Sequence, residues 1–353
     1  AGVEGGGTTW VAAIAEGDAT NIVARGEFPT TTPEATLSLV RAWLDASALE
    51  QPFDALGVAT FGPVDLDRSS ATYGFITLSP KPGWANVDVL GALCDRSVPC
   101  GFDTDANAPA MAEFAEMKRD AAARVQRDGG FDDDDNADNF VYDADGVQVY
   151  DTDGEEEDGA AASVTNLAYV TVGTGIGVGI VCAGEPVHGM LHPEAGHIRV
   201  ARLKADGFPG DEGAFAGSCM FHEDCVEGMA ASAAIARRCQ CGVSELAGVP
   251  DDHPAWDAAA HYIGGLCATL TLVASPQRIV LGGGVFQRRC LLTKVRAEAQ
   301  RQLGGYVQHD YVNTKRGLAE FIVTSKHGNN AGIVGALTLA VRAAEREAGT
   351  GHP

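Results

Sequence analysis

The sequence predicts an α/β protein built of two domains, and three observations support this. At 353 residues the chain exceeds the size at which a single hydrophobic core usually stops growing. Its composition, 45% hydrophobic with 44 glycines, is typical of α/β proteins with many tight strand-to-helix turns. Glycine turns follow or interrupt β-rich runs at three places, residues 5–7, 173–177 and 282–284. Three such turns, with an acidic strand end between them, indicate a nucleotide cleft.

The opening segment, residues 1–14, predicts a β-hairpin. In its turn, Gly6 and Gly7 let the backbone approach a ligand closely, and Thr8 and Thr9 offer hydroxyl and N–H groups to a phosphate. An ordinary glycine-rich hairpin turn is the alternative. A Walker loop is excluded, because its spaced G-K-[ST] is missing.

A helix and a buried strand are expected next. Residues 33–49 have helical periodicity with Pro33 in the first turn. Residues 54–66 indicate a buried strand that ends at Gly62 and Pro63. The loop at 77–86 follows, and its turn residues display three side chains that are candidates for contact with a ligand. These are Lys81, Trp84 and Asn86. The tryptophan either lines a small-molecule pocket or packs the loop down.

Residues 98–117 predict a short strand, an acidic turn and a helix. Asp105 lies where the helix begins, so it is either an N-cap or a catalytic carboxylate held at the carboxyl end of a sheet.

Residues 119–164 predict a solvated acidic insertion, with a small hairpin within it. Residues 128–158 contain fourteen Asp and Glu and no Lys or Arg, so of the net charge of −23 the rest of the chain carries −23 + 14 = −9. The overall charge argues against nucleic acid as a partner. A calcium site is a weaker alternative, because the EF-hand pattern with its terminal Glu is not met.

The stretch from residue 166 combines three binding features. An apolar strand ends in a glycine turn containing Thr174 and Gly175, and Glu194 and His197 follow, three residues apart. A carboxylate and an imidazole at this spacing suit sugar hydroxyls. A surface ion pair or a satisfied core histidine is the alternative.

A compact Cys/His cluster closes this stretch. Cys219, His222 and Cys225 form C-x₂-H-x₂-C, and His197 lies about twenty residues upstream. Four such ligands suit tetrahedral zinc and fill its coordination shell, so the metal would be structural. The alternative is that these thiols are incidental core residues. The nine cysteines are odd in number and irregularly spaced, which favours a reducing compartment over a disulfide framework.

The remaining chain predicts a helix beside the cluster at 225–238, a long apolar helix at 255–275, a buried strand at 275–286 and a C-terminal helix. No apolar run reaches the roughly 18 residues that span a bilayer, so a soluble, cytoplasmic protein without a membrane partner is expected.

Taken together, these motifs resemble the ROK family of sugar kinases, and within it the bacterial-type fructokinases. The matching pieces occur in family order and cover nearly everything except the acidic segment. They are V-E-G-G-G-T at 3–8, F-G-P-V-D at 61–65, S-P-K-P-G-W-A-N at 79–86, T-D-A-N-A at 104–108, V-G-T-G-I-G-V-G at 172–179, H-P-E-A-G-H-I at 192–198, the C-x₂-H-x₂-C, L-G-G-G-V at 281–285 and N-N-A-G-I-V-G-A-L at 329–337.

The resemblance implies a two-domain sugar kinase/actin-like (ribonuclease H-like) fold with a cleft between the domains. It also implies ATP-dependent phosphorylation of a hexose at its 6-hydroxyl, D-fructose first. Asp105 would be the base that deprotonates this hydroxyl as it attacks the γ-phosphate of MgATP, and His197 would bind both sugar and zinc. The other implied substrate contacts are Gly83, Asn86, Thr104, Glu194 and Glu227. The implied ATP contacts are Gly6, Gly7, Thr8, Thr9, Thr174, Gly175, Gly282, Gly283 and Gly284. The implied assembly is a homodimer.

Two domains are expected. One is residues 1–118, completed by a C-terminal helix at about 335–350. The other is residues 165–334, which include the segment 219–225 with the C-x₂-H-x₂-C motif, here called the zinc loop. Two departures from the family pattern bear on ATP binding. Thr9 stands where a Lys is usual, and Ala230-Ala231-Ser232-Ala233 stands where A-S-G-P is usual.

Three other functions stay open. One is a ROK kinase for glucose, mannose or an N-acetylhexosamine, and another is a catalytically weak sugar sensor, suggested by Thr9. A sugar-responsive repressor is the third, but the phosphate hairpin starts at residue 3 and the charge is wrong for DNA.

Overall fold

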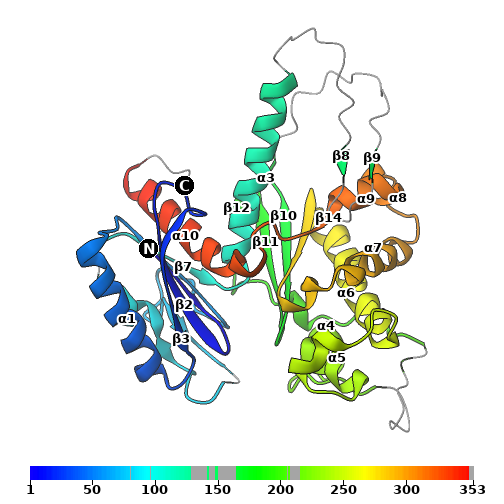
Figure 1. Cartoon of the computed structure of the whole chain (residues 1–353), viewed down its shortest axis with the longest axis horizontal. Coiled ribbons are helices and arrows are strands. Elements are labelled where there is room, and N and C mark those ends of the chain that lie inside the picture. The colour runs from blue at the N-terminus through cyan, green and yellow to red at the C-terminus, as the bar shows by residue number, and fades with distance from the viewer. Residues whose placement is uncertain are drawn as a thin grey trace.

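The computed structural model describes residues 1–79, 81–95, 97–128, 141–142, 148–149, 164–204, 206 and 215–349. These residues form two lobes (Figure 1), each built on a five-stranded mixed sheet. Helices cover the sheets, and α3 and α10 lie between them. The predicted two-domain α/β architecture is confirmed.

The sheet of the N-terminal lobe has the order β3-β2-β1-β4-β7. Its strands are β1 (Gly2–Gly5), β2 (Thr9–Ala15), β3 (Ile22–Pro29), β4 (Leu56–Thr60) and β7 (Cys100–Thr104). β1 pairs antiparallel with β2 across the first glycine turn and parallel with β4, which in turn pairs parallel with β7. The predicted N-terminal hairpin is therefore confirmed. β4 lies inside the sheet, between β1 and β7, which explains why all of its residues are buried.

The sheet of the C-terminal lobe repeats this arrangement, with the order β12-β11-β10-β13-β14. Its strands are β10 (Leu167–Val172), β11 (Ile176–Cys182), β12 (Glu185–Pro186), β13 (Arg278–Gly282) and β14 (Ile322–Thr324). β10 pairs antiparallel with β11 and parallel with β13, which pairs parallel with β14. The first and second glycine turns thus occupy equivalent places, each joining the first strand of a sheet to its antiparallel neighbour.

The helices account for most of the remaining chain. They are α1 (Pro33–Glu50), α2 (Val89–Leu93), α3 (Asn107–Asp128), α4 (Val226–Ala230), α5 (Ser232–Cys239), α6 (Pro254–Ala274), α7 (Arg289–Leu303), α8 (Asp310–Asn313), α9 (Lys315–Phe321) and α10 (Ala331–Glu347), with the 3₁₀ turns η1 (Ala195–His197), η2 (Val243–Gly248), η3 (Gly284–Gln287) and η4 (Gly328–Asn330). The helices predicted at 33–49 and 255–275 and at the C-terminus are confirmed. The one predicted at 225–238 is interrupted at Ala231, whose ψ of 164° is extended and not helical.

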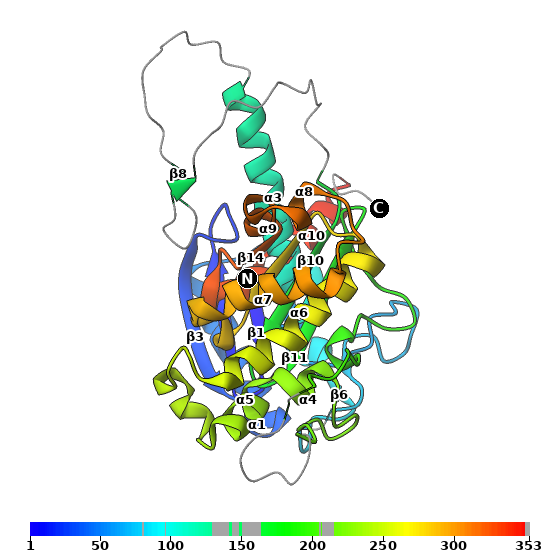
Figure 2. The ribbon, with the colours of Figure 1, turned by 90° about the vertical axis from the view of Figure 1, so that its right-hand side faces the viewer.

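Two helices join the lobes (Figure 1). Figure 2 looks onto the C-terminal lobe, where α6 and α7 lie in front of the sheet. α10, the last helix of the chain, packs on β1, β4 and β7 of the N-terminal lobe and also on α3. α3 packs against α10 on one side and against β10 and β11 of the C-terminal lobe on another. The approach of the helices is close, since a Cβ at Gly335 would lie 2.4 Å from the carbonyl carbon of Ala108. Glycine is needed there because two backbones meet.

The loop at 77–86 is packed down by its tryptophan. Trp84 is fully buried, its ring stacks on Trp10 at a centroid distance of 5.4 Å, and its Nε1 donates to the carbonyl of Thr31 at 2.9 Å. Of the two roles that the sequence left open for Trp84, packing the loop down is the one that the structure shows, and lining a ligand pocket is not. Packing the indole against other aromatic rings stabilises the N-terminal lobe more than leaving it in solvent would.

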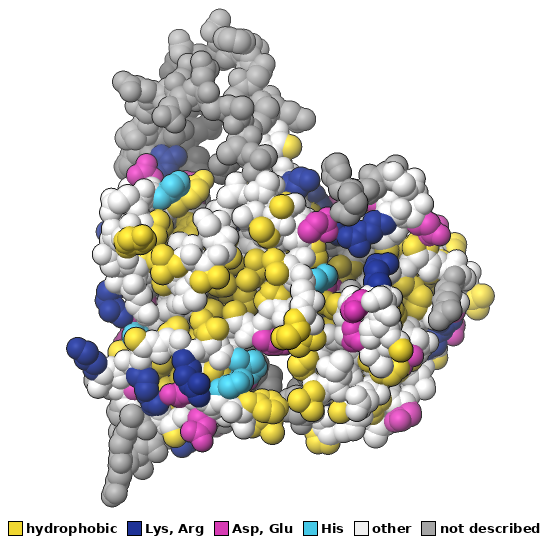
Figure 3. All heavy atoms as spheres, turned by 180° about the vertical axis from the view of Figure 1, so that it is seen from behind, with side chains coloured by type: hydrophobic (Ala, Val, Ile, Leu, Met, Phe, Trp, Pro, Cys, Tyr) yellow, Lys and Arg dark blue, Asp and Glu magenta, His cyan; other side chains and the backbone are white. Residues whose placement is uncertain are grey.

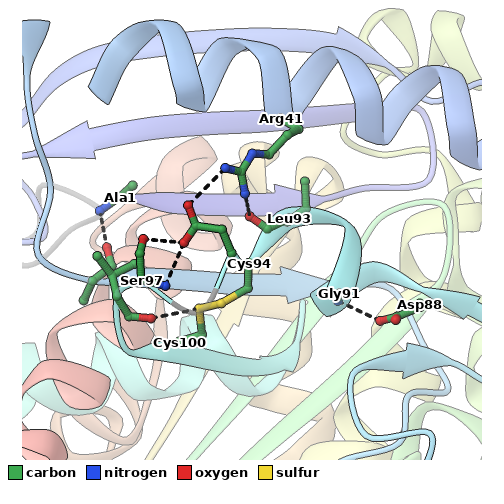
Figure 4. The surroundings of a disulfide bond; sticks show 11 residues. Ala1, Arg41, Asp88, Gly91, Leu93, Cys94, Ser97 and Cys100 are labelled. Atoms are coloured by element: carbon green, nitrogen blue, oxygen red, sulfur yellow. Dashed lines mark hydrogen bonds and ion pairs between the residues drawn. A yellow bond between two sulfur atoms is a disulfide. The ribbon is translucent and has the colours of Figure 1, made fainter. Parts of the chain in front are cut away.

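A disulfide joins Cys94, directly after α2, to Cys100, the first residue of β7 (Figure 4). Arg41 of α1 binds the chain beside this disulfide. It donates to the Leu93 carbonyl at 3.0 Å and to the Asp95 carboxylate at 3.1 Å. The irregular spacing of the cysteines favoured a protein without a disulfide framework and did not predict this bond, because a pairing between two cysteines depends on their separation in space.

α3 continues to Asp128 and so passes through position 119, where the sequence predicts the acidic insertion to begin. Within the insertion, β8 (Val141–Tyr142) pairs antiparallel with β9 (Gln148–Val149) as a small hairpin. The rest of the segment, including the residues of the calcium alternative, lies outside the described residues. Among the described helices, none has the length and apolar character needed to cross a membrane.

Candidate active site and metal centre

Asp105 lies at the carboxyl end of β7, one residue after the strand and two before α3. Its N–H donates to the Thr60 carbonyl at the end of β4, at 2.9 Å. The hydroxyl of Thr104 accepts the N–H of Asn107 at 2.9 Å and so caps α3. Because Thr104 performs the capping, the Asp105 carboxylate is left available to a ligand. In this bond the Thr104 hydroxyl only accepts, so its O–H can still donate to a substrate, the contact that the resemblance implies.

Three carboxylates lie near Asp105, and with it they form what we call the carboxylate cluster: Glu4, Asp105, Glu194 and Glu227. Burial raises the pKa of Asp105 to about 6. Burial, and then repulsion from Asp105, raise the pKa of Glu4 to about 7. The pKa of Glu194 is also raised to about 7, by burial first and then by Asp105 and Glu227. Such a concentration of acidic oxygens suits a divalent cation and the hydroxyl groups of a sugar.

Glu227, in the first turn of α4, is held by the second glycine turn. Its Oε2 accepts the N–H of Ile176 at 3.0 Å, and a Cβ at Gly175 would lie 2.6 Å from the same oxygen. A side chain at Gly175 would therefore displace the carboxylate. The C-terminal lobe thus brings a predicted phosphate turn and a predicted sugar ligand into direct contact.

His192 is a residue that the sequence analysis missed. It is buried, and its Nε2 accepts the N–H of Val64, in the opposite lobe, at 3.2 Å. Its Nδ1 lies 3.4 Å from Oε1 of Glu194. Since Nε2 accepts, the proton of the neutral ring lies on Nδ1, where the Pro193 carbonyl, also at 3.4 Å, accepts it and Glu194 lies equally near. Burial lowers the pKa of His192, which favours this neutral form.

The first glycine turn is held from two directions. Gly6 donates its N–H to the Thr9 carbonyl at 3.0 Å and accepts the Thr30 hydroxyl at 2.8 Å. Gly7 and Thr8 are exposed at its tip. The ammonium of Lys81 donates to the Gly7 carbonyl. A positive charge therefore reaches this turn although Thr9 has none.

The other two glycine turns meet in the C-terminal lobe. Gly283 has φ of +87°, and a Cβ there would lie 2.4 Å from the Val172 carbonyl, the last residue before the second turn. The N–H of Ser232, where α5 begins, donates to the Gly173 carbonyl at 2.9 Å. These two turns also contain the other predicted nucleotide contacts of this lobe, Thr174, Gly175, Gly282 and Gly284. The structure therefore joins two predicted nucleotide turns into one surface.

Gly83 and Asn86 lie apart from this group. Both are exposed, and a Cβ at Gly83 would face Pro33 at the start of α1 at 3.8 Å. Asn86 lines a groove beside α1. In the described residues, neither forms a hydrogen bond with the carboxylate cluster.

The four residues of the predicted metal site come together. The ligand atoms of His197, Cys219, His222 and Cys225 all lie within 4.8 Å of one another. Nδ1 of His197 is 3.7 Å from Sγ of Cys219 and 3.6 Å from Sγ of Cys225. Typical zinc–sulfur and zinc–nitrogen bonds in a tetrahedron put these atoms about 3.5 Å apart. The donor set and its spacing therefore fit a zinc ion, and Nε2 of His197 remains available to a sugar.

The model of the ROK family matches residues 1–125 and 147–343. The chain is 32% identical over 352 residues to a putative fructokinase of Bacillus subtilis (strain 168), covering 99% of this chain and 98% of that protein. It is 32% identical to a fructokinase of Pediococcus pentosaceus, with 96% of each chain covered. The fold is similar to that of a ROK hexokinase from Thermus thermophilus, with a TM-score of 0.63, 24% identity, and 96% of this chain and 97% of that chain covered.

Proposed function

The chain belongs to the ROK family, and on this premise we propose that it transfers the γ-phosphoryl group of ATP to the 6-hydroxyl of a hexose, with D-fructose as the first candidate. The observation that carries the proposal is the carboxylate cluster, which lies between glycine turns from both lobes. The names of the two relatives that match over nearly the full length of the chain support fructose.

Asp105 is the general base in this proposal. Its position after β7 is rigid, and its pKa of about 6 lies close to neutral pH, where a base is effective while still mostly ionised. It takes the proton of the attacking hydroxyl and returns it to water after the phosphoryl group has moved. Glu194 and Glu227 accept hydrogen bonds from other sugar hydroxyls and so orient the ring.

The phosphates of ATP would lie between the glycine turns. Gly6, Gly7 and Thr8 would approach them from one lobe, and Thr174 and Gly175 from the other, with the adenosine against Gly282–Gly284. Glu4 and Asp105 would help to hold Mg²⁺. When bound, Mg²⁺ neutralises charge on the phosphate oxygens during transfer.

A zinc ion bound by His197, Cys219, His222 and Cys225 would be structural, since four protein ligands leave no open position. With Nδ1 of His197 holding zinc, the ring would be fixed and its Nε2 would be left for a hydrogen bond with a sugar hydroxyl. The zinc loop thereby positions one side of the sugar site.

ADP release with ATP, Mg²⁺ and each of fructose, glucose, mannose and N-acetylhexosamines tests the proposal. Fructose should give the highest kcat/KM, and Asp105→Asn should reduce kcat at least about a thousandfold while sugar binding survives. Asp120→Asn, on the helix α3 that follows Asp105 but paired with Lys326 on the surface, is the matched control. Preference for an aldose would overturn fructose as the substrate. Absence of turnover with every sugar would overturn the kinase and leave the sensor.

A weak sensor is the second candidate, because Thr9 lacks the usual charge. The contact of Lys81 with Gly7 argues against it, since this ammonium lies where the phosphates are expected.

A further inference from the structure

A cavity of about 110 Å³ lies at the junction of the lobes, apart from the glycine turns. Its walls come from the N-terminal lobe, the C-terminal end of α10, and the segment from β12 to residue 188. Six residues that line it are charged or titratable: Arg68, Asp103, Glu185, His188, Arg342 and Arg346. None of them has a role in the proposed phosphoryl transfer.

The cavity is positively charged in a protein that is otherwise strongly acidic. Three guanidinium groups line it, against two carboxylates. One carboxylate, Asp103, is buried and is already paired with Nε2 of His188 at 2.9 Å. The net charge of the side chains that line the cavity is therefore at least +1, whereas the whole chain has a net charge of −23. Figure 3 shows basic, acidic and histidine side chains side by side on the back of the molecule, over the half that belongs to the N-terminal lobe.

The arginines are not fully satisfied by their neighbours. Arg342 and Arg346 both donate to the same oxygen, Oε2 of Glu185. Arg68 is exposed and lies over the Tyr73 ring at 5.7 Å. It forms no ion pair in the part of the chain that the structure describes. A single carboxylate oxygen thus accepts hydrogen bonds from two of the three guanidinium groups. Each guanidinium has five N–H donors, so donors remain for a ligand.

We propose that this cavity binds a phosphate group, either as inorganic phosphate or as part of a small phosphorylated metabolite. Guanidinium groups match phosphate oxygens with paired, charge-assisted hydrogen bonds, and the volume admits several water-sized groups. The ligand would take the place of Glu185 between Arg342 and Arg346 and would recruit Arg68. The proposal does not depend on which sugar the cleft accepts.

Occupancy of the cavity would be communicated to the start of α3. Asp103 lines the cavity and also accepts the N–H of Thr104 and the Nδ2 of Asn107, both at 2.8 Å. Asp105 lies between these two residues. A phosphate that draws His188 away from Asp103 would therefore disturb the segment that holds the proposed base. The cavity is placed to regulate the site from outside it.

Calorimetric titration of the full chain tests the proposal, with inorganic phosphate in one arm and fructose 6-phosphate in the other. Fructose, Mg²⁺ and a non-hydrolysable ATP analogue are present throughout, so that the cleft is filled. Binding of both probes identifies phosphate itself as sufficient, and binding of the sugar phosphate alone shows that the metabolite is required. Absence of binding by both would overturn the proposal.

Variants locate the binding. Arg68→Gln combined with Arg346→Gln should weaken it about tenfold or more, because two charge-assisted contacts are lost. Glu185→Gln should tighten it severalfold, since the competing carboxylate is removed, whereas a purely structural ion pair predicts no gain. Arg316→Gln, an exposed arginine paired with Glu320 on α9, is the matched control. Arg68→Gln alone breaks no ion pair between described residues and gives a folded variant.

Wild-type affinity in the double variant would overturn the proposal, as would weaker binding by Glu185→Gln. Because the readout is heat of binding and not turnover, these outcomes are distinct from a failure of the proposed kinase activity.

Discussion

Asp105 and its acidic neighbours concentrate negative charge in one place, where Glu4, Asp105 and Glu227 are only partly exposed to solvent. Each carboxylate of the cluster whose pKa is raised favours its protonated form in the folded chain. In the protein without a ligand, the carboxylates therefore repel one another. A bound cation, or a sugar that donates hydrogen bonds from its hydroxyl groups, should reduce that repulsion. This links ligand binding to stability at the level of single residues.

The first prediction concerns the dependence of stability on pH. The pKa of Glu194 is about 7 in the folded chain and 4.5 without the fold, so below about 4.5 the residue is protonated in both states. As pH rises toward 7, ionisation favours the unfolded chain. In buffer without added Mg²⁺, Glu194→Gln should have the same Tm as wild type near pH 4.5 and a higher Tm at pH 7.5.

Thermal melts across this pH range check the prediction, and Glu320→Gln on α9 reports the effect of removing a negative charge elsewhere. A Tm gain for Glu194→Gln that is equal at both ends of the range would contradict it.

The second prediction concerns His192, which connects the Val64 N–H in one lobe to Glu194 in the other. His192→Ala should leave Glu194 free to turn, so KM for the sugar should rise about tenfold with a smaller change in kcat. Met190→Ala, in the same loop with a side chain that is 96% exposed, should keep the wild-type KM. Steady-state kinetics give both values. A loss confined to kcat would instead assign His192 to the transfer step.

Short elements, among them the zinc loop and α4, carry residues of the proposed sugar site. The zinc loop has almost no regular structure of its own apart from a bridge between Cys219 and Glu223. Its order therefore depends on the four ligands, and it leads directly into α4, which carries Glu227. An element of this kind gains its stability from the metal.

The third prediction follows for this loop. Cys225→Ser should lower the bound zinc, measured by elemental analysis of the purified protein, from about one per chain to much less. It should also lower the Tm and raise KM for the sugar, because His197 and Glu227 lose their support. Cys182→Ser, at an exposed free cysteine on β11, is the control. One zinc per chain in both variants would show that the metal lies elsewhere.

At the scale of the whole molecule, two sheets of the same topology each carry a glycine turn between their first strand and its antiparallel neighbour, and α3 and α10 lie between the sheets. The last helix of the chain belongs to the core of the first lobe, packing on β1, β4 and β7. The two ends of the sequence are therefore folded into one unit, so the lobes cannot be separated by a single cut.

The fourth prediction tests this junction. Gly335→Val would place side-chain atoms against the backbone of α3 at Ala108, which is 2.4 Å from an ideal Cβ. Unfolding free energy should fall by about 2–3 kcal/mol through overpacking, and activity should fall with it as the lobes shift. Gly248→Ala has open space around its Cβ and should be near neutral. Denaturant unfolding compares the two, and equal stability of both variants would contradict the proposed tight crossing.

The sequence alone determined what depends on local pattern. Periodicity predicted α1, α6 and α10, and the glycine runs predicted the hairpin turns. C-x₂-H-x₂-C with His197 predicted four side chains whose ligand atoms do come together, because spacing along the chain limits which side chains can meet. Only the tertiary structure decided what depends on distant segments. It buried Trp84 against Trp10, paired Cys94 with Cys100, brought His192 to Val64 and placed Glu4 beside Asp105. These contacts join residues from different elements, and no local spacing specifies them, since they form only when the sheets, helices and loops have packed.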